Sequence, residues 1–211
     1  MLNLDFNLIS FINNLNLIQN MESTLLNSKV ALVIIDLQKG IVYGHHALGP
    51  NTSEEVVLNA SKLAESCREH NIPVFLVHVN PSPATRLKPD ADTIIQMKAP
   101  GADWAEFVEE MTPKSTDVVI TKQQWGAFYG TDLDLQLRRR KIDTIILCGI
   151  STNIGVESTA RNAFELGFNQ IFVEDAMAAM TSEEHNNSVN YIFKRIGRVV
   201  KTKDILKQIN E

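Results

Sequence analysis

Short runs of apolar, largely β-branched residues alternate along this chain with longer segments whose apolar positions recur at helical spacing. The short runs predict six strands, at residues 30–36, 73–79, 117–121, 144–148, 170–174 and 199–201. The longer segments predict helices at residues 53–70, 103–111, 131–140, 155–166, 181–195 and 202–209. Thr131 and Thr181 each precede a helix and have an acid three residues later, and Gly167 follows a helix, as helix caps do.

The predicted strands are nearly continuous apolar runs rather than alternating ones. Such runs are typical of strands buried on both faces, and therefore of a parallel sheet covered by helices. Strands that alternate with helices predict an α/β fold with a doubly wound, open sheet. In such sheets ligands bind beyond the carboxyl ends of the strands, so polar residues at those ends are the first candidates for a site.

Composition narrows the classes of protein. The chain has 211 residues, which suits one domain, and its formal net charge of -5 argues against general binding to nucleic acid. No apolar run reaches the roughly 18 residues of a membrane span, and no secretory signal is evident. Two cysteines, Cys67 and Cys148, are too few for a disulfide framework, so we expect a reducing, cytoplasmic location.

Residues 1–27 differ in composition from the rest and form an N-terminal extension to a domain at residues 28–211. The first 20 residues are rich in Asn, Leu, Ile and Phe, with Asp5 as their only charge. The extension could be a short helix that docks on the domain or on a partner subunit. Alternatively, the natural chain starts at Met21. The sequence leaves both readings open.

Two charged residues stand at predicted strand ends. Asp36 follows five apolar residues, at the rim of a buried sheet, where burial raises the pKa of a carboxyl group and a nearby cation lowers it. Lys122 ends the third strand and could pair with a carboxylate at a neighbouring strand end. Taken singly, Asp36 could have no role beyond bracing a loop, and Lys122 could be an ordinary solvated lysine. Together they indicate a site.

A third feature is the turn at residues 149–156, between the fourth strand and its helix. Backbone N–H groups at such a helix start can bind an anion or stabilise an oxyanion. The simpler alternative is an ordinary helix start capped by Asn153. Cys148, inside the preceding strand, is expected to be an inert core residue.

These features resemble the isochorismatase-like hydrolases, also called the cysteine-hydrolase superfamily. The resemblance spans roughly residues 28–205 and rests on ALVIIDLQ at 31–38, VITK at 119–122, WGAFYGTDLDL at 125–135, GISTNIGVESTAR at 149–161 and EDA at 174–176. It implies a three-layer Rossmann-like fold with a six-stranded parallel sheet and helices on both faces. It also implies a functional acid at Asp36, a functional lysine at Lys122, a cis peptide between Ile150 and Ser151, and a homo-oligomer.

The chain departs from the superfamily at its nucleophile, because Gly155 stands where the amidohydrolases have cysteine. Without a thiolate, their acyl-enzyme route is closed. The metal ligands of the nicotinamidases are not evident either. His45 and His46 are adjacent in a loop and His78 lies in a strand, so we expect no metal and no cofactor.

The true isochorismatases, which cleave a vinyl ether, resemble this chain in having glycine at that position. By that resemblance, Asp36 protonates the methylene carbon of the substrate and water attacks the resulting oxocarbenium ion. Lys122 holds the carboxylate region of the substrate and tunes Asp36, while Gly155 leaves room for the ring. The loop after the second strand matches poorly, and Arg86 within it is either a carboxylate ligand or a surface residue.

Five further residues are candidates for substrate contact because of their positions. Gln38 lies two residues past Asp36. Trp125 and Phe128 could form a pocket wall, or equally pack in the core or at a subunit interface. Ser151 and Asn153 could supply hydrogen-bond donors.

Three readings of function follow. The first is an isochorismatase-type hydrolase acting on a small, anionic metabolite, with Asp36 as general acid. The second is an amide or ester hydrolase in which Asp36 activates water. The third is a catalytically degenerate protein that binds a metabolite or serves in an assembly. Neither nucleic acid nor a membrane is expected as a partner.

Overall fold

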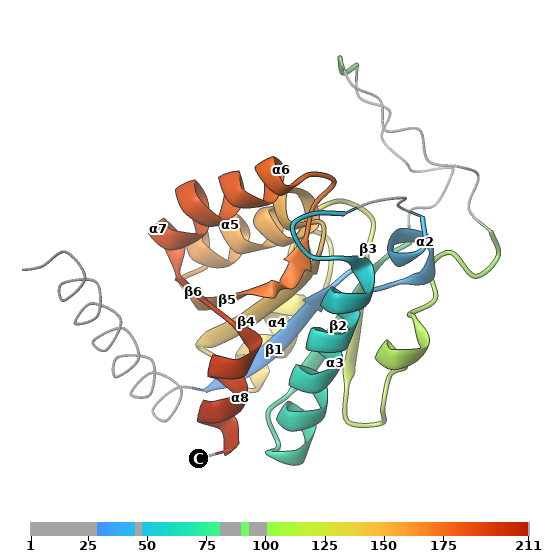
Figure 1. Cartoon of the computed structure of the whole chain (residues 1–211). Coiled ribbons are helices and arrows are strands. Elements are labelled where there is room, and N and C mark those ends of the chain that lie inside the picture. The colour runs from blue at the N-terminus through green and yellow to red at the C-terminus, as the bar shows by residue number, and fades with distance from the viewer. Residues whose placement is uncertain (1–28, 45–47, 81–89, 93–100, 211) are drawn as a thin grey trace, which may run out of the picture.

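A six-stranded parallel sheet with helices on both faces forms the centre of the molecule (Figure 1). The computed structural model describes residues 29–44, 48–80, 90–92 and 101–210. The strand order is β3-β2-β1-β4-β5-β6, and every neighbouring pair is parallel. The strands are β1 (Val30–Ile35), β2 (Val74–Val79), β3 (Val118–Lys122), β4 (Thr144–Ile150), β5 (Asn169–Ala178) and β6 (Arg198–Val200). The predicted α/β fold is confirmed.

The helices divide between the two faces of the sheet. Helices α3 and α8 pack together on one face, and α5 with the α6–α7 segment lies on the other, beside α4 (Figure 1). Their bounds are α2 (Lys39–Val42), α3 (Ser53–Glu69), α4 (Leu133–Arg139), α5 (Glu157–Glu165), α6 (Ser182–Asn187), α7 (Lys194–Ile196) and α8 (Thr202–Asn210). A 3-10 turn, η1 (Glu109–Met111), and two π-helical segments, η2 (Thr152–Val156) and η3 (Ser188–Phe193), complete them.

The burial of the two central strands, β1 and β4, explains why the sheet could be predicted from the sequence. All six residues of β1 and all seven of β4 are buried, because helices cover both of their faces. Burial on two faces requires continuous apolar runs, which is the pattern that the sequence shows. Parallel pairing places Asp36, at the end of β1, and Lys122, at the end of β3, at the same edge of the sheet.

Side-chain caps begin two of the helices. Thr181 and Glu184 form the predicted capping box at the start of α6. Thr52 and Glu55 form a second one before α3, and the predicted start of this helix at residue 53 is confirmed. Gly167 follows α5 with a φ of 79°, the left-handed conformation that favours glycine at this position.

Several predicted bounds were wrong. The predicted helix at 103–111 is reduced to η1, and the helix predicted at 131–140 starts at Leu133, with Thr131 accepting only the Leu133 N–H. The helix predicted from residue 155 begins earlier, as η2 at Thr152.

Strand β5 is longer than predicted because an irregular segment interrupts it. Its pairing with β4 shifts between Leu147 and Gly149. The Asn51 amide donates to two carbonyl oxygens of this segment, those of Glu174 and Met177, at 3.0 and 2.8 Å. These bonds satisfy backbone groups that the interrupted ladder leaves unpaired, so the strand continues past the irregularity.

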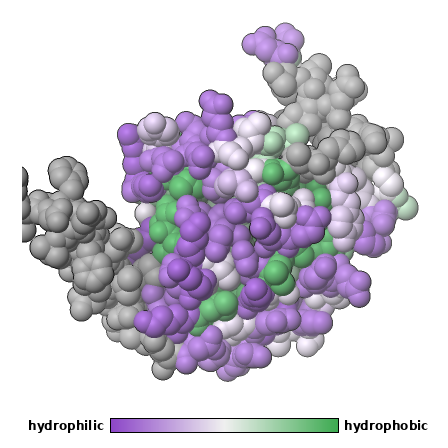
Figure 2. Space-filling model, viewed as in Figure 1, coloured by the Kyte–Doolittle hydropathy of each residue, from purple (hydrophilic) through white to green (hydrophobic). Residues whose placement is uncertain are grey.

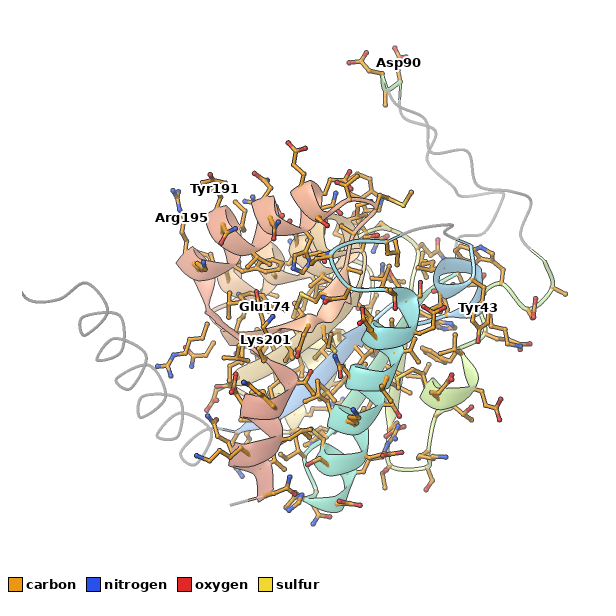
Figure 3. The ribbon with its side chains drawn as sticks, viewed as in Figure 1. Tyr43, Asp90, Glu174, Tyr191, Arg195 and Lys201 are labelled. Carbon is orange, nitrogen blue, oxygen red and sulfur yellow. The ribbon has the colours of Figure 1, made fainter. Side chains whose placement is uncertain are left out.

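Polar residues cover most of the face seen in Figure 2, and apolar residues appear there in small separate groups. Tyr191 and Arg195 project outward from the segment that carries η3 and α7 (Figure 3). A single exposed aromatic residue such as Tyr191 is ordinary on a protein surface. No helix in the described part of the chain is long and apolar enough to cross a membrane.

Candidate active site

Asp36 occupies the position directly after β1 and is almost fully buried, with 4% of its surface exposed. Its φ is 56°, in the left-handed region, which aspartate tolerates better than most residues. Its Oδ2 atom lies 2.7 Å from Lys122 Nζ, and the Lys122 side chain is equally buried. The two strand-end charges predicted from the sequence therefore form a buried ion pair.

All three donor positions of the Lys122 ammonium group are occupied. Nζ donates to the carbonyl oxygens of Gln124 and Trp125, at 3.1 and 2.9 Å, in addition to its bond with Asp36. An ammonium group has three N–H donors and no acceptor. Lys122 therefore has no donor left for a substrate carboxylate, and the expectation that it holds that group directly is corrected. Its role in tuning Asp36 stays a prediction, in line with its lowering effect on the pKa of that carboxyl group.

The two oxygens of Asp36 are not equivalent. Oδ2 accepts from Lys122, whereas Oδ1 is buried and has no hydrogen-bond partner. Burial raises the pKa of Asp36 to about 6, against the opposing effects of Lys122 and, to a smaller extent, His78. A carboxyl group with this pKa is partly protonated near neutral pH. Because Oδ2 is held by the ammonium, the proton belongs on Oδ1.

Gly155 leaves space beside this pair. A Cβ atom built on it would lie 2.9 Å from Asp36 Oδ2, 3.0 Å from Ile35 Cγ2 and 3.6 Å from Lys122 Nζ. The structure thus brings together the three residues that the sequence analysis assigned to catalysis. The peptide bond between Ile150 and Ser151 is cis, as the resemblance implied.

Gly149 allows β4 to lie close to β1 at Ile35, next to Asp36. Its φ is 123°, and a Cβ atom on it would lie 2.0 Å from the Ile35 carbonyl oxygen. Ile35 immediately precedes Asp36 in the chain. Glycine is therefore required here by both conformation and space.

The substitution Gly155→Ala is expected to lower kcat/KM by roughly 10- to 100-fold, because the new methyl group displaces a carboxylate that Lys122 holds in place. Steady-state kinetics on any substrate that the wild-type protein turns over will measure this. Gly101→Ala, which adds the same methyl group at an exposed position, is the control. Unchanged kinetics for Gly155→Ala would show that the space at Gly155 is not needed.

The η2 turn places Ser151 and Asn153 near Gly155 in the chain, and both side chains are half-buried. Asn153 Oδ1 is a buried acceptor without a partner, so it remains a candidate substrate ligand. Asn153 does not cap the helix. The cap position is Ser151, which makes no side-chain capping bond. Thr152 lies within hydrogen-bond distance of His185 Nδ1, at 2.9 Å, which ties the turn to α6.

The Gln38 amide is fully engaged within the protein. Nε2 donates to the Val79 and Trp104 carbonyl oxygens, and Oε1 accepts from the Val79 N–H, at 3.0, 3.2 and 2.8 Å. Its side chain is fully buried. The proposed contact between Gln38 and substrate is therefore corrected to a structural role, that of joining the segment after β1 to the end of β2.

The two aromatic candidates differ in surroundings. Phe128 is buried and packs on Phe168, with ring centroids 5.8 Å apart. Phe168 directly precedes β5, at the amino end of the strands. Phe128 therefore packs in the core, which was the alternative to its forming a pocket wall. Trp125 is 62% exposed, and only its carbonyl oxygen touches the ion pair.

Histidines and cysteines do not form a reactive cluster in the described part of the chain. No group of three or more His, Cys, Asp or Glu side chains there converges as metal ligands do. His78 lies within hydrogen-bond distance of the Ala105 carbonyl oxygen and the Thr121 hydroxyl. Burial raises the pKa of the Cys148 thiol, which fits an inert core residue. His45, His46 and Arg86 lie outside the described residues.

The EDA motif of the sequence lies in the irregular part of β5 and has structural contacts. Asp175 Oδ1 accepts from the backbone N–H and the hydroxyl of Thr202, at 2.7 and 2.8 Å, and so stabilises the start of α8. Glu174 pairs with Lys201 at 2.8 Å (Figure 3). Neither acid belongs to the Asp36 site.

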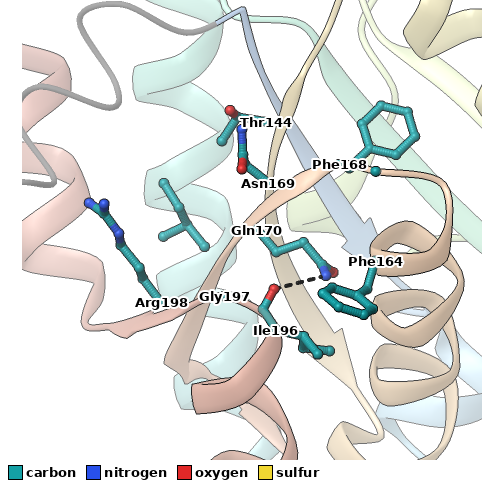
Figure 4. Close-up of a pocket in the computed structure, with 10 residues that line it drawn as sticks. Thr144, Phe164, Phe168, Asn169, Gln170, Ile196, Gly197 and Arg198 are labelled. Carbon is teal, nitrogen blue, oxygen red and sulfur yellow. Dashed lines mark hydrogen bonds between the residues drawn. The ribbon is translucent and has the colours of Figure 1, made fainter.

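A separate hollow of about 490 Å³ opens at the amino ends of β4, β5 and β6 (Figure 4). Thr144, Gln170 and Arg198 contribute to its lining, and the Gln170 amide donates to the Ile196 carbonyl oxygen across it. Asp36 lies at the carboxyl ends of the strands. This hollow is therefore on the opposite edge of the sheet from the ion pair.

Comparison with known proteins gives a consistent result. Residues 30–204 match the Isochorismatase domain. An uncharacterized isochorismatase family protein, YecD of Escherichia coli O157:H7, is 53% identical over 187 residues, which are 87% of this chain and 98% of YecD. The solved structure of an isochorismatase family protein from Burkholderia thailandensis has a TM-score of 0.82 and 40% identity, over 88% of this chain and 97% of that one.

N-carbamoylsarcosine amidase from Thermoplasma acidophilum is a further similar structure. It has a TM-score of 0.69 and 30% identity, and the match covers 82% of this chain and 96% of that one. Its fold and that of the Burkholderia protein agree with the six-stranded sheet described above. This chain therefore belongs to the isochorismatase family, a family of hydrolases.

Proposed function

We propose that this protein cleaves a vinyl ether in a small, anionic metabolite, with Asp36 as the general acid. The observation that carries the proposal is the state of the Asp36 carboxyl group. Its pKa is raised to about 6, one oxygen is bound to Lys122, and the other is buried without a partner. An acid poised near neutral pH suits proton transfer to substrate. The glycine at position 155 adds space beside it.

In the proposed reaction, Asp36 transfers its Oδ1 proton to the terminal methylene carbon of the vinyl ether. A C–H bond forms there, and positive charge develops on the ether carbon as an oxocarbenium ion. Water adds to that carbon and loses a proton to Asp36, which restores the acid. The resulting hemiketal breaks its C–O bond and releases a ketone and an alcohol. One water molecule is consumed.

Lys122 acts on Asp36 rather than on the substrate in this scheme. After proton transfer the carboxylate is negative, and the ammonium at 2.7 Å stabilises that charge inside a buried site. The Gln124 and Trp125 carbonyl oxygens hold the ammonium in position meanwhile. Asn153, with an unpartnered Oδ1, is the proposed acceptor for a substrate hydroxyl.

The experiment that tests the proposal is turnover of isochorismate by the purified full-length protein, followed as pyruvate release. Pyruvate release that is lost in the Asp36→Ala variant supports acid-catalysed vinyl-ether cleavage. Failure of the wild-type protein to release pyruvate would overturn isochorismate as the substrate and leave the family assignment intact.

A second candidate keeps the site and reverses the role of Asp36. The match to N-carbamoylsarcosine amidase favours it, because that protein is named for hydrolysis of an amide. Here the Asp36 carboxylate would activate water for attack on an amide or ester. A third candidate, metabolite binding without turnover, predicts that isochorismate raises the Tm of the protein while no pyruvate appears.

The pH dependence of kcat/KM separates acid from base. Because the pKa of Asp36 is about 6, an enzyme that needs the protonated acid is expected to have constant kcat/KM below pH 6 and a tenfold loss per pH unit above it. A base would give the reverse, a rise up to about pH 6 followed by a plateau. A rising profile would overturn the general-acid assignment even if pyruvate is released.

A further inference from the structure

The site has two parts, the Asp36–Lys122 pair and the Gly155 turn, which come from separate elements. Their relative position therefore depends on contacts between those elements. Asp36 and Lys122 are delivered by β1 and β3, whereas Gly155 is delivered by the η2 turn that follows β4. The loop after Lys122 is attached to the first half, because the Lys122 ammonium donates to two of its carbonyl oxygens. Within the described part of the chain, one hydroxyl group forms hydrogen bonds with both this loop and the Gly155 turn.

That hydroxyl belongs to Thr159, on α5. Its Oγ1 donates to the Gly155 carbonyl oxygen at 2.7 Å and accepts from the Ala127 backbone N–H at 3.1 Å. Both bonds are buried, and the side chain of Thr159 is fully buried. Ala127 lies two residues after Trp125, whose carbonyl oxygen holds Lys122. A short path of hydrogen bonds therefore runs from the Asp36–Lys122 pair to the backbone of Gly155.

A threonine inside a helix often bonds the carbonyl oxygen four residues earlier without any further role. Two observations distinguish Thr159 from that case. The same oxygen also accepts an N–H from outside the helix, and that N–H is buried. In addition, the loop lies directly against α5: a Cβ atom built on Gly126 would be only 2.7 Å from Asn162 Oδ1. The hydroxyl is thus the polar link within a close contact between loop and helix.

We infer that Thr159 is a positioning residue that fixes the Gly155 turn relative to the loop holding Lys122, and through that loop relative to Asp36. This inference rests on the proposed role of Asp36. Thr159 touches no reacting atom itself. Its effect reaches the chemistry through the position of the Lys122 ammonium and the space at Gly155, both of which depend on the separation of loop and turn.

The test compares two conservative variants. Thr159→Val keeps the shape of the side chain and removes both hydrogen bonds, whereas Thr159→Ser keeps the hydroxyl. We expect Thr159→Val to lower kcat by roughly 10- to 100-fold, since small displacements of catalytic groups have effects of this size. We expect Thr159→Ser to retain most of the wild-type kcat. Urea unfolding of each variant ensures that the assays are made on folded protein.

A second readout does not depend on the substrate. Titration of the Asp36 carboxyl carbon by NMR in labelled full-length protein reports the surroundings of the acid directly, and the groups that act on it are Lys122 and His78. The Asp36 pKa is expected to move in Thr159→Val and to stay at its wild-type value in Thr159→Ser. A loss of stability alone would not produce that difference.

The two proposals fail in distinguishable ways. If the wild-type protein does not release pyruvate, the proposed reaction is wrong, and the NMR titration still tests Thr159. If Thr159→Val has the wild-type Asp36 pKa, or turns over substrate at the wild-type rate, then Thr159 has only a structural role and the inference is overturned. An equal change in Thr159→Val and Thr159→Ser overturns it as well, because the hydroxyl is then not the cause.

Discussion

Asp36→Asn is expected to lower kcat by roughly 10²- to 10⁴-fold, the usual contribution of a general acid. Asparagine has nearly the same shape as aspartate and also tolerates the left-handed backbone found at this position, where φ is 56°. It cannot donate a proton from Oδ1 in the way that a carboxylic acid does. The loss should appear in kcat with little change in KM, because the substitution removes a transition-state interaction.

A matched control is available in Asp117→Asn. Asp117 is also a buried aspartate with a cationic partner, Arg68, at 2.8 Å, but it lies just before β3, at the amino edge of the sheet. We expect this variant to be less stable and to keep the wild-type kcat. If Asp117→Asn and Asp36→Asn reduce kcat equally, the effect at Asp36 reflects disturbed folding, and its assignment as the acid fails.

The second large effect concerns stability. Lys122→Met is expected to lower the free energy of unfolding by about 3–5 kcal/mol at pH 8, because it leaves the Asp36 carboxylate buried without its counter-ion. Methionine fills much of the space of the lysine stem, so the loss of charge dominates. The free energy of unfolding can be measured by urea denaturation followed by circular dichroism.

The pH dependence of this loss provides the internal check. The folded-state pKa of Asp36 is already above its ordinary value of 3.8, and loss of Lys122 removes an interaction that lowers it. Stabilisation by a proton bound more tightly in the folded state is complete at low pH and is lost as pH rises through the folded-state pKa. Lys122→Met should therefore be less destabilising at pH 5 than at pH 8. Equal losses at both pH values would contradict the buried-charge explanation.

The Asp36–Lys122 ion pair also bears on whether this region serves function or stability. Burying two charges costs desolvation energy that their attraction does not always offset, and buried pairs can often be replaced by apolar residues without loss of stability. We expect the double variant Asp36→Asn with Lys122→Met to be more stable than Lys122→Met alone, since no buried charge remains. Retention of the pair in this chain thus accords with a chemical role for Asp36.

The sequence by itself determined the architecture and predicted which two charged residues meet at the strand ends. Strands such as β1 and β4 are buried on both faces, so their residues must be apolar throughout, and this constraint is visible without any partner. Parallel strands share one carboxyl edge, which is why Asp36 and Lys122 could be predicted to meet. The capping box at Thr181 was equally readable, because both of its bonds lie within four residues.

Only the tertiary structure decided how the polar groups are paired. Gln38 bonds Val79, 41 residues away, and Thr159 bonds Ala127, 32 residues away, so neither role leaves a local pattern in the sequence. The acceptors of Lys122 are backbone carbonyl oxygens, which every residue possesses, and no residue type marks them. Apolar burial depends on the character of a segment and can be read locally. Hydrogen-bond pairing depends on which segments the fold brings together, and it therefore required the structure.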